Sequence, residues 1–198
     1  MNPYHQISFL KSVAALQQLP SDEGIEVAFA GRSNAGKSSA LNFLTGIKKL
    51  ARTSKNPGCT QFINVFPLDD TRRLIDLPGY GYAKVPQTVK AVWQKNLSKY
   101  LETRESLKGL VVLMDCRHPL KELDKHLINW AIERQLPLHV LLTKSDKLSK
   151  SAVMQTCRQV REAISQTCDT VKVQPFSTHQ KQGLEELIAR LNTWFEWE

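Results

Sequence analysis

The segment from Gly31 to Ser38, GRSNAGKS, constrains the fold of this chain most. It matches the pattern G-x-x-x-x-G-K-[ST], follows the β-rich run 25–30 and opens a helical segment from about Gly36 to Gly46. Such a loop turns consecutive backbone N–H groups toward phosphate oxygens, and the helix adds its positive amino end. It predicts a phosphate-binding loop (P-loop) in which Lys37 contacts the β- and γ-phosphates and the Ser38 hydroxyl binds Mg²⁺. The predicted nucleotide contacts are Gly31, Arg32, Ser33, Asn34, Ala35, Gly36, Lys37 and Ser38.

The rest of the chain alternates β-rich runs with helical patterns. Continuous apolar runs such as 110–115 and 138–143 are typical of parallel strands that are covered on both faces. The alternation predicts an α/β domain with a six-stranded, doubly wound, mostly parallel sheet and helices on both faces. We expect one domain over residues 25–198, with residues 1–24 as an extension packing on it. The expected strands are 25–30, 62–68, 72–77, 110–115, 138–143 and 171–176, and the second and third form a hairpin.

The identity of the nucleotide base is predicted from a segment at the end of a core strand, Thr143, Lys144, Ser145 and Asp146. One carboxylate can accept both the N1–H and the 2-amino group of guanine, whereas adenine would leave Asp146 unpaired at about 1–3 kcal/mol. We expect the Lys144 stem to lie over the purine ring. This pattern argues against a nucleotide kinase or an ATPase. A weaker segment, Phe176, Ser177 and Thr178, follows the last strand, where a backbone N–H could reach guanine O6.

Two further segments are expected to respond to the γ-phosphate. Asp76 would hold Mg²⁺ through water, and the Gly79 N–H would meet the γ-phosphate. Thr60 is our choice for the threonine that closes on Mg²⁺, with Thr53 as the competitor, and we expect residues 46–61 to be ordered by GTP. Lys37, Thr60 and Gly79 are the predicted catalytic residues. The contacts predicted from these segments are Gly58, Cys59, Thr60, Gln61, Phe62, Asp76, Leu77, Pro78 and Gly79.

Charge and composition bear on partners and location. The net charge of +8 favours either simple solubility or a polyanionic partner such as RNA. No apolar run approaches the roughly 18 to 20 residues of a membrane span, and the start lacks signal-peptide features. The four cysteines show no Cys-x-x-Cys pair or zinc-ligand spacing, so reduced thiols are expected. We expect a monomer in the cytoplasm, without a membrane.

These segments together resemble the YihA/YsxC/EngB family of bacterial Era-like GTPases. The resemblance runs from about Ile25 to the C-terminus, and GRSNAGKS and DLPGYGYAKVP are its most specific parts. It implies GTP binding with Mg²⁺ and a role in assembling the large ribosomal subunit. It also implies a linked need in normal cell division and septation. Two departures are Cys59, where a basic residue is usual, and Thr178-His179, which replaces an alanine- or serine-containing continuation.

The hydrolytic step leaves alternatives open. Tyr80 stands where Ras-type enzymes carry the glutamine that orients water. If Tyr80 only packs, catalysis rests on Mg²⁺, Lys37 and the P-loop amides, with slow turnover; Asn34 could also help to hold K⁺. The alternative function is a nucleotide-regulated RNA- or protein-binding module with negligible turnover. For RNA contact we expect the helix 86–103, through Lys95 and Lys99, together with the Arg72-Arg73 hairpin.

Overall fold

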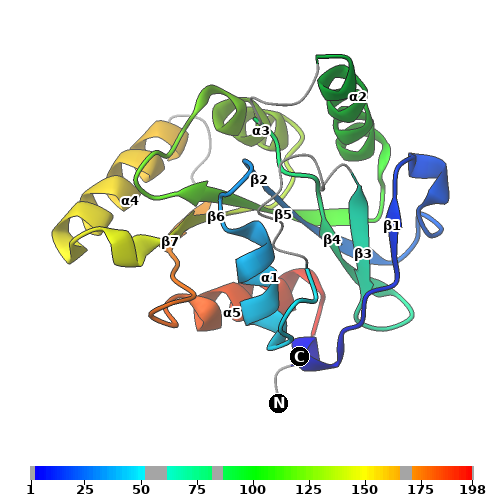
Figure 1. Ribbon diagram of the computed structural model, residues 1–198, viewed down its shortest axis with the longest axis horizontal. Helices are drawn as coiled ribbons and strands as arrows, with labels where there is room; N and C mark the ends of the chain where they lie inside the picture. The colour runs from blue at the N-terminus through cyan, green and yellow to red at the C-terminus, as the bar shows by residue number, and fades with distance from the viewer. Residues whose placement is uncertain (1–2, 52–61, 82–86, 166–170, 198) are drawn as a thin grey trace.

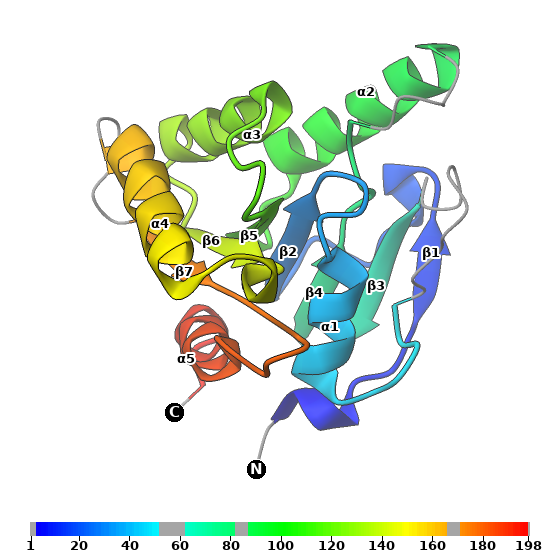
Figure 2. The same cartoon turned by 60° about the vertical axis from the view of Figure 1, so that its left-hand side comes forward.

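The fold has three layers, with a central sheet between two layers of helices (Figures 1 and 2). It was obtained as a computed structural model that describes residues 3–51, 62–81, 87–165 and 171–197. Helices α2, α3 and α4 cover one face of the sheet, and α1 and α5 cover the other. The helices are α1 Lys37–Thr45, α2 Gln87–Thr103, α3 Glu122–Glu133, α4 Lys150–Ser165 and α5 Leu184–Trp194.

Within the described residues the sheet has seven strands in the order β1-β3-β4-β2-β5-β6-β7. Strands β4, β2, β5, β6 and β7 are parallel, and β1 and β3 are antiparallel to their neighbours. The carboxyl ends of the parallel strands therefore meet at one edge. The strands are β1 Lys11–Val13, β2 Ile25–Gly31, β3 Ile63–Pro67, β4 Arg72–Asp76, β5 Leu107–Asp115, β6 Leu138–Thr143 and β7 Lys172–Pro175.

Alternating residues of the central strands fill the two halves of the core. Along β2, Val27 and Phe29 pack toward α1 and α5, while Ala28 and Ala30 pack toward α2, α3 and α4. This follows from the two-residue period of a strand. It also explains why these strands read as continuous apolar runs, since both faces are covered.

The expected six-stranded sheet is corrected to seven strands by β1. Residues 11–13 pair antiparallel with β3, with Val13 opposite Ile63. Three residues with one buried side chain are too short to show a strand period, so the sequence gives no signal there. Upstream, Tyr4 is fully buried, and its hydroxyl lies 2.9 Å from Asn192 Oδ1 in α5.

A buried charge cluster joins β2, β4 and the end of α2. Glu26 is fully buried and contacts Arg73 at 2.9 Å, Arg104 at 2.7 Å and the Tyr100 hydroxyl at 2.9 Å. The Arg72 Nε donates to Phe195 O at 2.7 Å, and its guanidinium lies over the Trp197 ring. The expectation that the Arg72-Arg73 hairpin contacts RNA is therefore wrong for Arg73, which is internal, and Arg72 is already engaged.

The cysteines and helices otherwise follow the sequence pattern. Cys116 and Cys157 are buried free thiols. Cys157 lies on the buried stripe of α4 with Val153, Val160 and Ile164. Cys59 and Cys168 lie outside the described residues.

Among the residues that the structure describes, no helix is both long and apolar enough to cross a membrane, and no cluster of metal-ligating side chains is found.

Candidate nucleotide-binding site

The P-loop connects β2 to α1 through a tight turn. Ala35 N donates to Arg32 O at 2.9 Å, and Ala40 N donates to Gly36 O at 2.9 Å, which starts the helix. Gly36 has a φ of 92°, a left-handed conformation that favours glycine. Asn34, also at positive φ, is exposed at the tip of the loop.

Lys37 and Asp76 form a buried ion pair between the start of α1 and the end of β4. The second oxygen of Asp76 accepts a hydrogen bond from Asn64 Nδ2 at 3.1 Å. Asp76 thus lies beside the residue that precedes Ser38. A carboxylate and a hydroxyl are oxygen donors of the kind that Mg²⁺ prefers, so the donor set fits this ion. Asn64 was not predicted as a site residue. The only signal for it was its place on β3, the strand that pairs with the strand ending at Asp76.

The segment after Asp76 lies directly against the P-loop. A β-carbon at Gly79 would lie 3.2 Å from Ser33 Cα and 3.3 Å from Ser33 N, so a side chain here would push against the P-loop backbone. Tyr80 N donates to Gly31 O at 3.2 Å, and Ser33 N donates to Tyr80 O at 2.8 Å. Leu77 is buried, and its N–H donates to Phe29 O at 3.0 Å. The structure therefore brings Gly79 and the backbone of Tyr80 against the P-loop. The contacts predicted between the nucleotide and Leu77, Pro78 and Gly79 stay predictions.

The loops after β6 and β7 meet at the same edge of the sheet. The Ser177 hydroxyl donates to Asp146 Oδ1 at 2.7 Å, and Ser145 N donates to Phe176 O at 3.3 Å. The Ser177 hydrogen bond lowers the pKa of Asp146, so this carboxylate is held ionised as an acceptor. Phe176 is buried, whereas the neighbouring Thr178 is exposed.

Thr143 and Lys144 bind the P-loop itself. The Thr143 hydroxyl lies 2.6 Å from Ala35 O, and Lys144 Nζ donates to Asn34 O at 2.8 Å. Lys144 has a φ of 58°, which is uncommon for a residue with a side chain and is kept where surrounding contacts require it. These bonds fix the distance between the predicted base-reading loop and the predicted phosphate loop.

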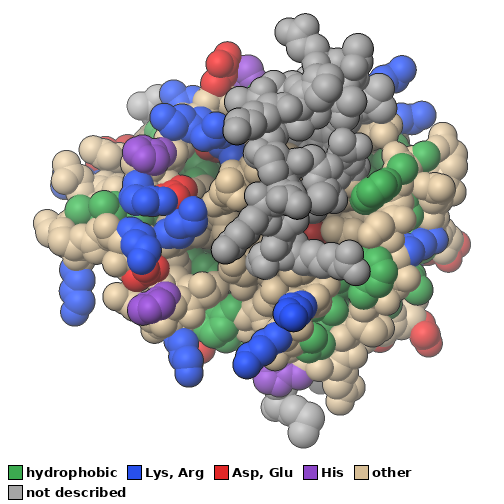
Figure 3. Space-filling view, in the orientation of Figure 1, with side chains coloured by type: hydrophobic (Ala, Val, Ile, Leu, Met, Phe, Trp, Pro, Cys, Tyr) green, Lys and Arg blue, Asp and Glu red, His purple; other side chains and the backbone are tan. Residues whose placement is uncertain are grey.

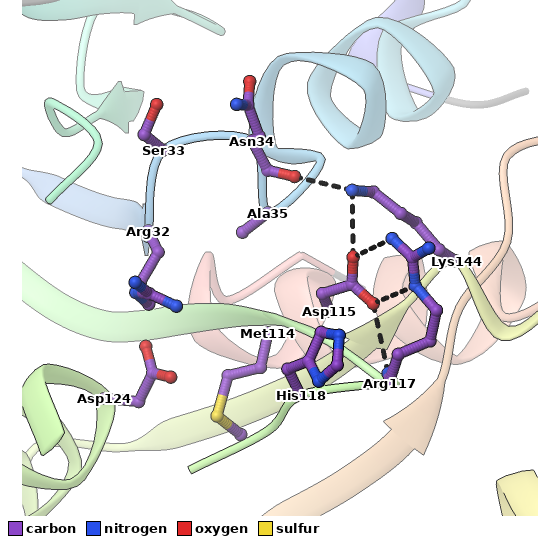
Figure 4. A pocket seen from close by; sticks show the side chains of 10 residues that line it. All are labelled: Arg32, Ser33, Asn34, Ala35, Met114, Asp115, Arg117, His118, Asp124 and Lys144. Atoms are coloured by element: carbon purple, nitrogen blue, oxygen red, sulfur yellow. Dashed lines mark hydrogen bonds and ion pairs between the residues drawn. The ribbon is translucent and has the colours of Figure 1, made fainter. Parts of the chain in front are cut away.

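Asp115 and Arg117 complete this connection and were not predicted as site residues. Asp115 Oδ2 contacts Lys144 Nζ at 3.0 Å, and Arg117 binds both carboxylate oxygens, at 2.9 and 2.6 Å (Figure 4). Burial alone raises the pKa of Asp115, but the bonds from Arg117 and Lys144 outweigh it and hold the pKa well below its usual value. The available signal was the position of Asp115 at the end of a core strand, as for Asp76.

These residues border a pocket of about 260 Å³ beside the P-loop. Figure 4 shows Arg32 and Asp124 facing each other at one side, and the Lys144, Asp115 and Arg117 chain at the other. Burial raises the pKa of Asp124, while its bonds to Tyr80 and Lys121 oppose this. The lining residues are Arg32, Ser33, Asn34, Ala35, Met114, Asp115, Arg117, His118, Asp124 and Lys144.

Part of the predicted site lies outside the described residues, namely Gly58, Cys59, Thr60, Gln61 and the competitor Thr53. Phe62, which follows them, is 42% exposed and immediately precedes β3. The roles predicted for Thr60 and its neighbours therefore stay predictions.

The fold and the convergence of these loops define a P-loop GTPase, with the G-domain arrangement of strands and nucleotide loops. A protein-family profile described as a 50S ribosome-binding GTPase matches residues 26–144. A curated protein of Coxiella burnetii, called "Probable GTP-binding protein EngB", is 55% identical over 195 residues, which is 98% of this chain and 95% of that protein. One of the same name from Mannheimia succiniciproducens is 56% identical over 192 residues, covering 97% of this chain and 94% of that protein.

A solved structure described as that of a "probable GTP-binding protein engB" has the same fold, with a TM-score of 0.70. It is 23% identical and covers 86% of this chain and 98% of its own. On the sequence matches, the chain belongs to the EngB family of GTP-binding proteins.

Proposed function

We propose that this protein is a slow, Mg²⁺-dependent GTPase that acts as a switch in the assembly of the large ribosomal subunit. The observation that carries the proposal is that Asp76 and Lys144, which are far apart in sequence, both bind the P-loop. Asp146 follows Lys144 by two residues and is held by Ser177. The proposed contact residues are the P-loop 31–38 and residues 58–62, 76–79, 143–146 and 176–178. They belong to a single domain over residues 25–198, which residues 1–24 extend through β1.

Phosphate binding would rest on the P-loop amides and Lys37. Lys37 is paired with Asp76, and γ-phosphate binding would require its ammonium group to exchange this carboxylate for phosphate oxygens. Asp76 would then be free to accept from a water on Mg²⁺, and Ser38 and Thr60 would hold the ion. The ion would supply positive charge to the phosphate oxygens. The Gly79 N–H, adjacent to the P-loop, would sense the γ-phosphate.

Guanine selection would rest on Asp146. Its carboxylate is ionised and oriented by the Ser177 hydroxyl at 2.7 Å, so it can accept the two N–H groups that guanine presents side by side. A base that lacks these donors would leave the carboxylate unpaired, which costs about 1–3 kcal/mol. The Lys144 stem, fixed by Asn34 and Asp115, would form one wall for the purine ring.

The position of Tyr80 supports the proposal of slow turnover. Its hydroxyl is used by Asp124, so this side chain offers no equivalent of a water-orienting glutamine. The same contact supports the alternative function, a nucleotide-regulated binding module with negligible turnover. Asn34, exposed at the P-loop tip, could hold K⁺ as an additional cation.

The ribosomal role is supported by the description of the matching family profile and by the net charge of +8. Because ribosomes are made in the cytoplasm, we place the protein there, bound to its RNA-rich partner and not to a membrane. A failing ribosome supply would account for a linked need in cell division and septation. We propose that the protein acts as a monomer on its target.

Phosphate release at saturating GTP tests this function, with and without isolated large ribosomal subunits. We expect slow release by the protein alone and faster release with subunits. Release no faster than in protein-free buffer, in both samples, would favour the binding module instead. Replacing K⁺ by Na⁺ in the same assay tests whether Asn34 holds K⁺. A lower rate in Na⁺ would support this role, and an equal rate would contradict it.

A further inference from the structure

Exposed basic side chains border the nucleotide loops at the carboxyl edge of the sheet. They come from the segment after β5, from the start of α3 and from the segment after β6. Figure 3 shows Lys, Arg and His side chains gathered on the side of the molecule where Figure 1 places α3, α4 and these loops. We call this set the basic rim; it consists of Arg117, His118, Lys121, Lys125, Lys147 and Lys150.

Neighbouring carboxylates pair with two of the rim cations, Arg117 and Lys147, and leave its other lysines uncompensated. Asp115 contacts Arg117 and Lys144. Asp124 accepts a hydrogen bond from the Tyr80 hydroxyl, and Asp146 contacts Ser177 and Lys147. Across the described residues, no ion pair is formed by Lys121, Lys125 or Lys150. The rim therefore presents a positive field to solvent, with Glu122 as an exposed carboxylate within it.

The placement of Lys150 costs stability. Lys121, by contrast, precedes α3 in extended backbone, and the first turn of that helix carries Glu122 and Asp124. Lys150 is the first residue of α4, and the first turn of that helix carries no acidic residue. A cation at a helix amino end opposes the helix dipole by about 0.3–1 kcal/mol. Solubility alone does not require a lysine at this place. A bound anionic partner would turn its unfavourable electrostatic contribution into a favourable one.

Arg117 is both exposed and held in place. Its side chain is 42% exposed, while two of its nitrogens are fixed on Asp115 at 2.9 and 2.6 Å. The same carboxylate holds Lys144, which donates to the P-loop at Asn34 O. A chain of charge-assisted bonds thus runs from the rim to the phosphate loop. A ligand bound to Arg117 would compete with Asp115 for it, and Asp115 in turn holds Lys144 at the P-loop.

The competing basic surface is weaker than its sequence suggests. Near α2, Arg73 and Arg104 are turned into the cluster around Glu26. Lys95 and Lys99 remain exposed on the described part of that helix. Among the side chains that the structure describes, the rim has more exposed cations than α2 has.

We propose that the basic rim binds the phosphate backbone of RNA, next to the GTP site on the same edge of the sheet. This inference rests on the proposed ribosomal function, because it names the surface that would make the contact. Phosphates arranged along a strand match a row of lysine and arginine side chains, and such contacts release counterions and make binding salt-dependent.

The test compares three variants that each lose two positive charges. Lys121→Ala/Lys125→Ala alters the rim, Lys95→Ala/Lys99→Ala alters α2, and Lys108→Ala/Lys172→Ala removes exposed lysines near the amino ends of β5 and β7. Binding is measured with a non-hydrolysable GTP analogue over several salt concentrations. The probes are isolated large ribosomal subunits, protein-free ribosomal RNA and phosphatidylglycerol vesicles. Circular dichroism and GDP affinity check that each variant is folded.

We expect the rim variant alone to bind subunits and RNA several-fold more weakly, with a log–log salt slope lower by about 1.4–1.8. Wild-type affinity and slope in the rim variant, or a loss that follows the α2 pair instead, would overturn the inference while the ribosomal function stands. Rim-dependent binding to vesicles but not to RNA would also overturn it. A wild-type chain that binds neither subunits nor RNA removes both proposals.

Discussion

The Tyr80 hydroxyl donates a hydrogen bond to Asp124 Oδ1 over 2.9 Å, and both side chains are buried. The backbone of Tyr80 is bound to Gly31 and Ser33 of the P-loop, while Asp124 lies in the first turn of α3. The residue that follows Gly79 therefore links the phosphate loop to α3. Burial and the adjacent Asp124 charge raise the pKa of Tyr80, so the phenol stays a donor at neutral pH.

Tyr80→Phe should destabilise the fold but leave turnover largely intact. The variant leaves Asp124 Oδ1 without its donor in a buried site, at a cost of about 1–3 kcal/mol. Because the phenol acts on α3, we expect the rate of GTP turnover per folded molecule to stay within about threefold, roughly 0.7 kcal/mol of barrier. Urea unfolding and phosphate release measure the two effects. A more than tenfold loss of rate at unchanged stability would make Tyr80 a catalytic residue.

Asp146→Asn should shift base preference from guanine toward xanthine. An amide can donate to the 2-oxo group that xanthine carries in place of the 2-amino group, and it loses one acceptor for guanine. We expect GTP affinity to fall by at least about tenfold, or 1.4 kcal/mol, and XTP affinity to rise. Competition of GTP and XTP against a fluorescent GDP measures both. Unchanged GTP affinity with no gain for XTP would remove Asp146 from the base site.

The two P-loop side chains should separate phosphate binding from Mg²⁺ binding. Lys37→Ala removes the cation for the phosphates, so the affinity for GTP should fall with and without Mg²⁺. It also leaves buried Asp76 without its ion pair, so the folded fraction must be determined first. Ser38→Ala should lose affinity only when Mg²⁺ is present. Titration of a fluorescent GTP analogue in Mg²⁺ and in EDTA checks this, and wild-type affinity in both variants contradicts the assignment.

Much of the site could be predicted because its signals are local. Each of the P-loop, Asp76–Gly79 and Thr143–Asp146 is a short segment that ends a strand, and parallel strands bring their carboxyl ends together. The doubly wound order then places them around one loop without any knowledge of side-chain contacts. The same reasoning could have included Asp115, which ends β5 in the same way.

The remaining features depend on contacts between distant residues. Glu26 joins Arg73 and Arg104 from three separate elements, and nothing in the residues beside each of them reveals the pairing. Strand β1 is specified by its partner β3 rather than by its own three residues. The hydrogen bond of Tyr80 to Asp124 spans 44 positions of sequence, so the residue could be read either as a catalytic substitute or as a packing residue.

His139 is buried in β6, and its ring Nε2 lies 2.7 Å from Gln174 Oε1. Burial is the main cause that lowers the pKa of His139 to about 4, from an ordinary 6.5. Between these two values the unfolded chain binds more protons than the folded protein. The free energy of unfolding that this site contributes is therefore complete above about pH 6.5 and falls as the pH drops toward about 4.

His139→Gln keeps an N–H donor for Gln174 and removes the titration. We expect urea unfolding to show that the wild type loses about 2 kcal/mol more than the variant between about pH 7 and about pH 5. All other groups titrate alike in the two proteins, so the difference isolates this side chain. Parallel pH profiles for the two would mean that His139 takes up its proton over the same pH range in the folded protein as in the unfolded chain, so that burial does not lower its pKa.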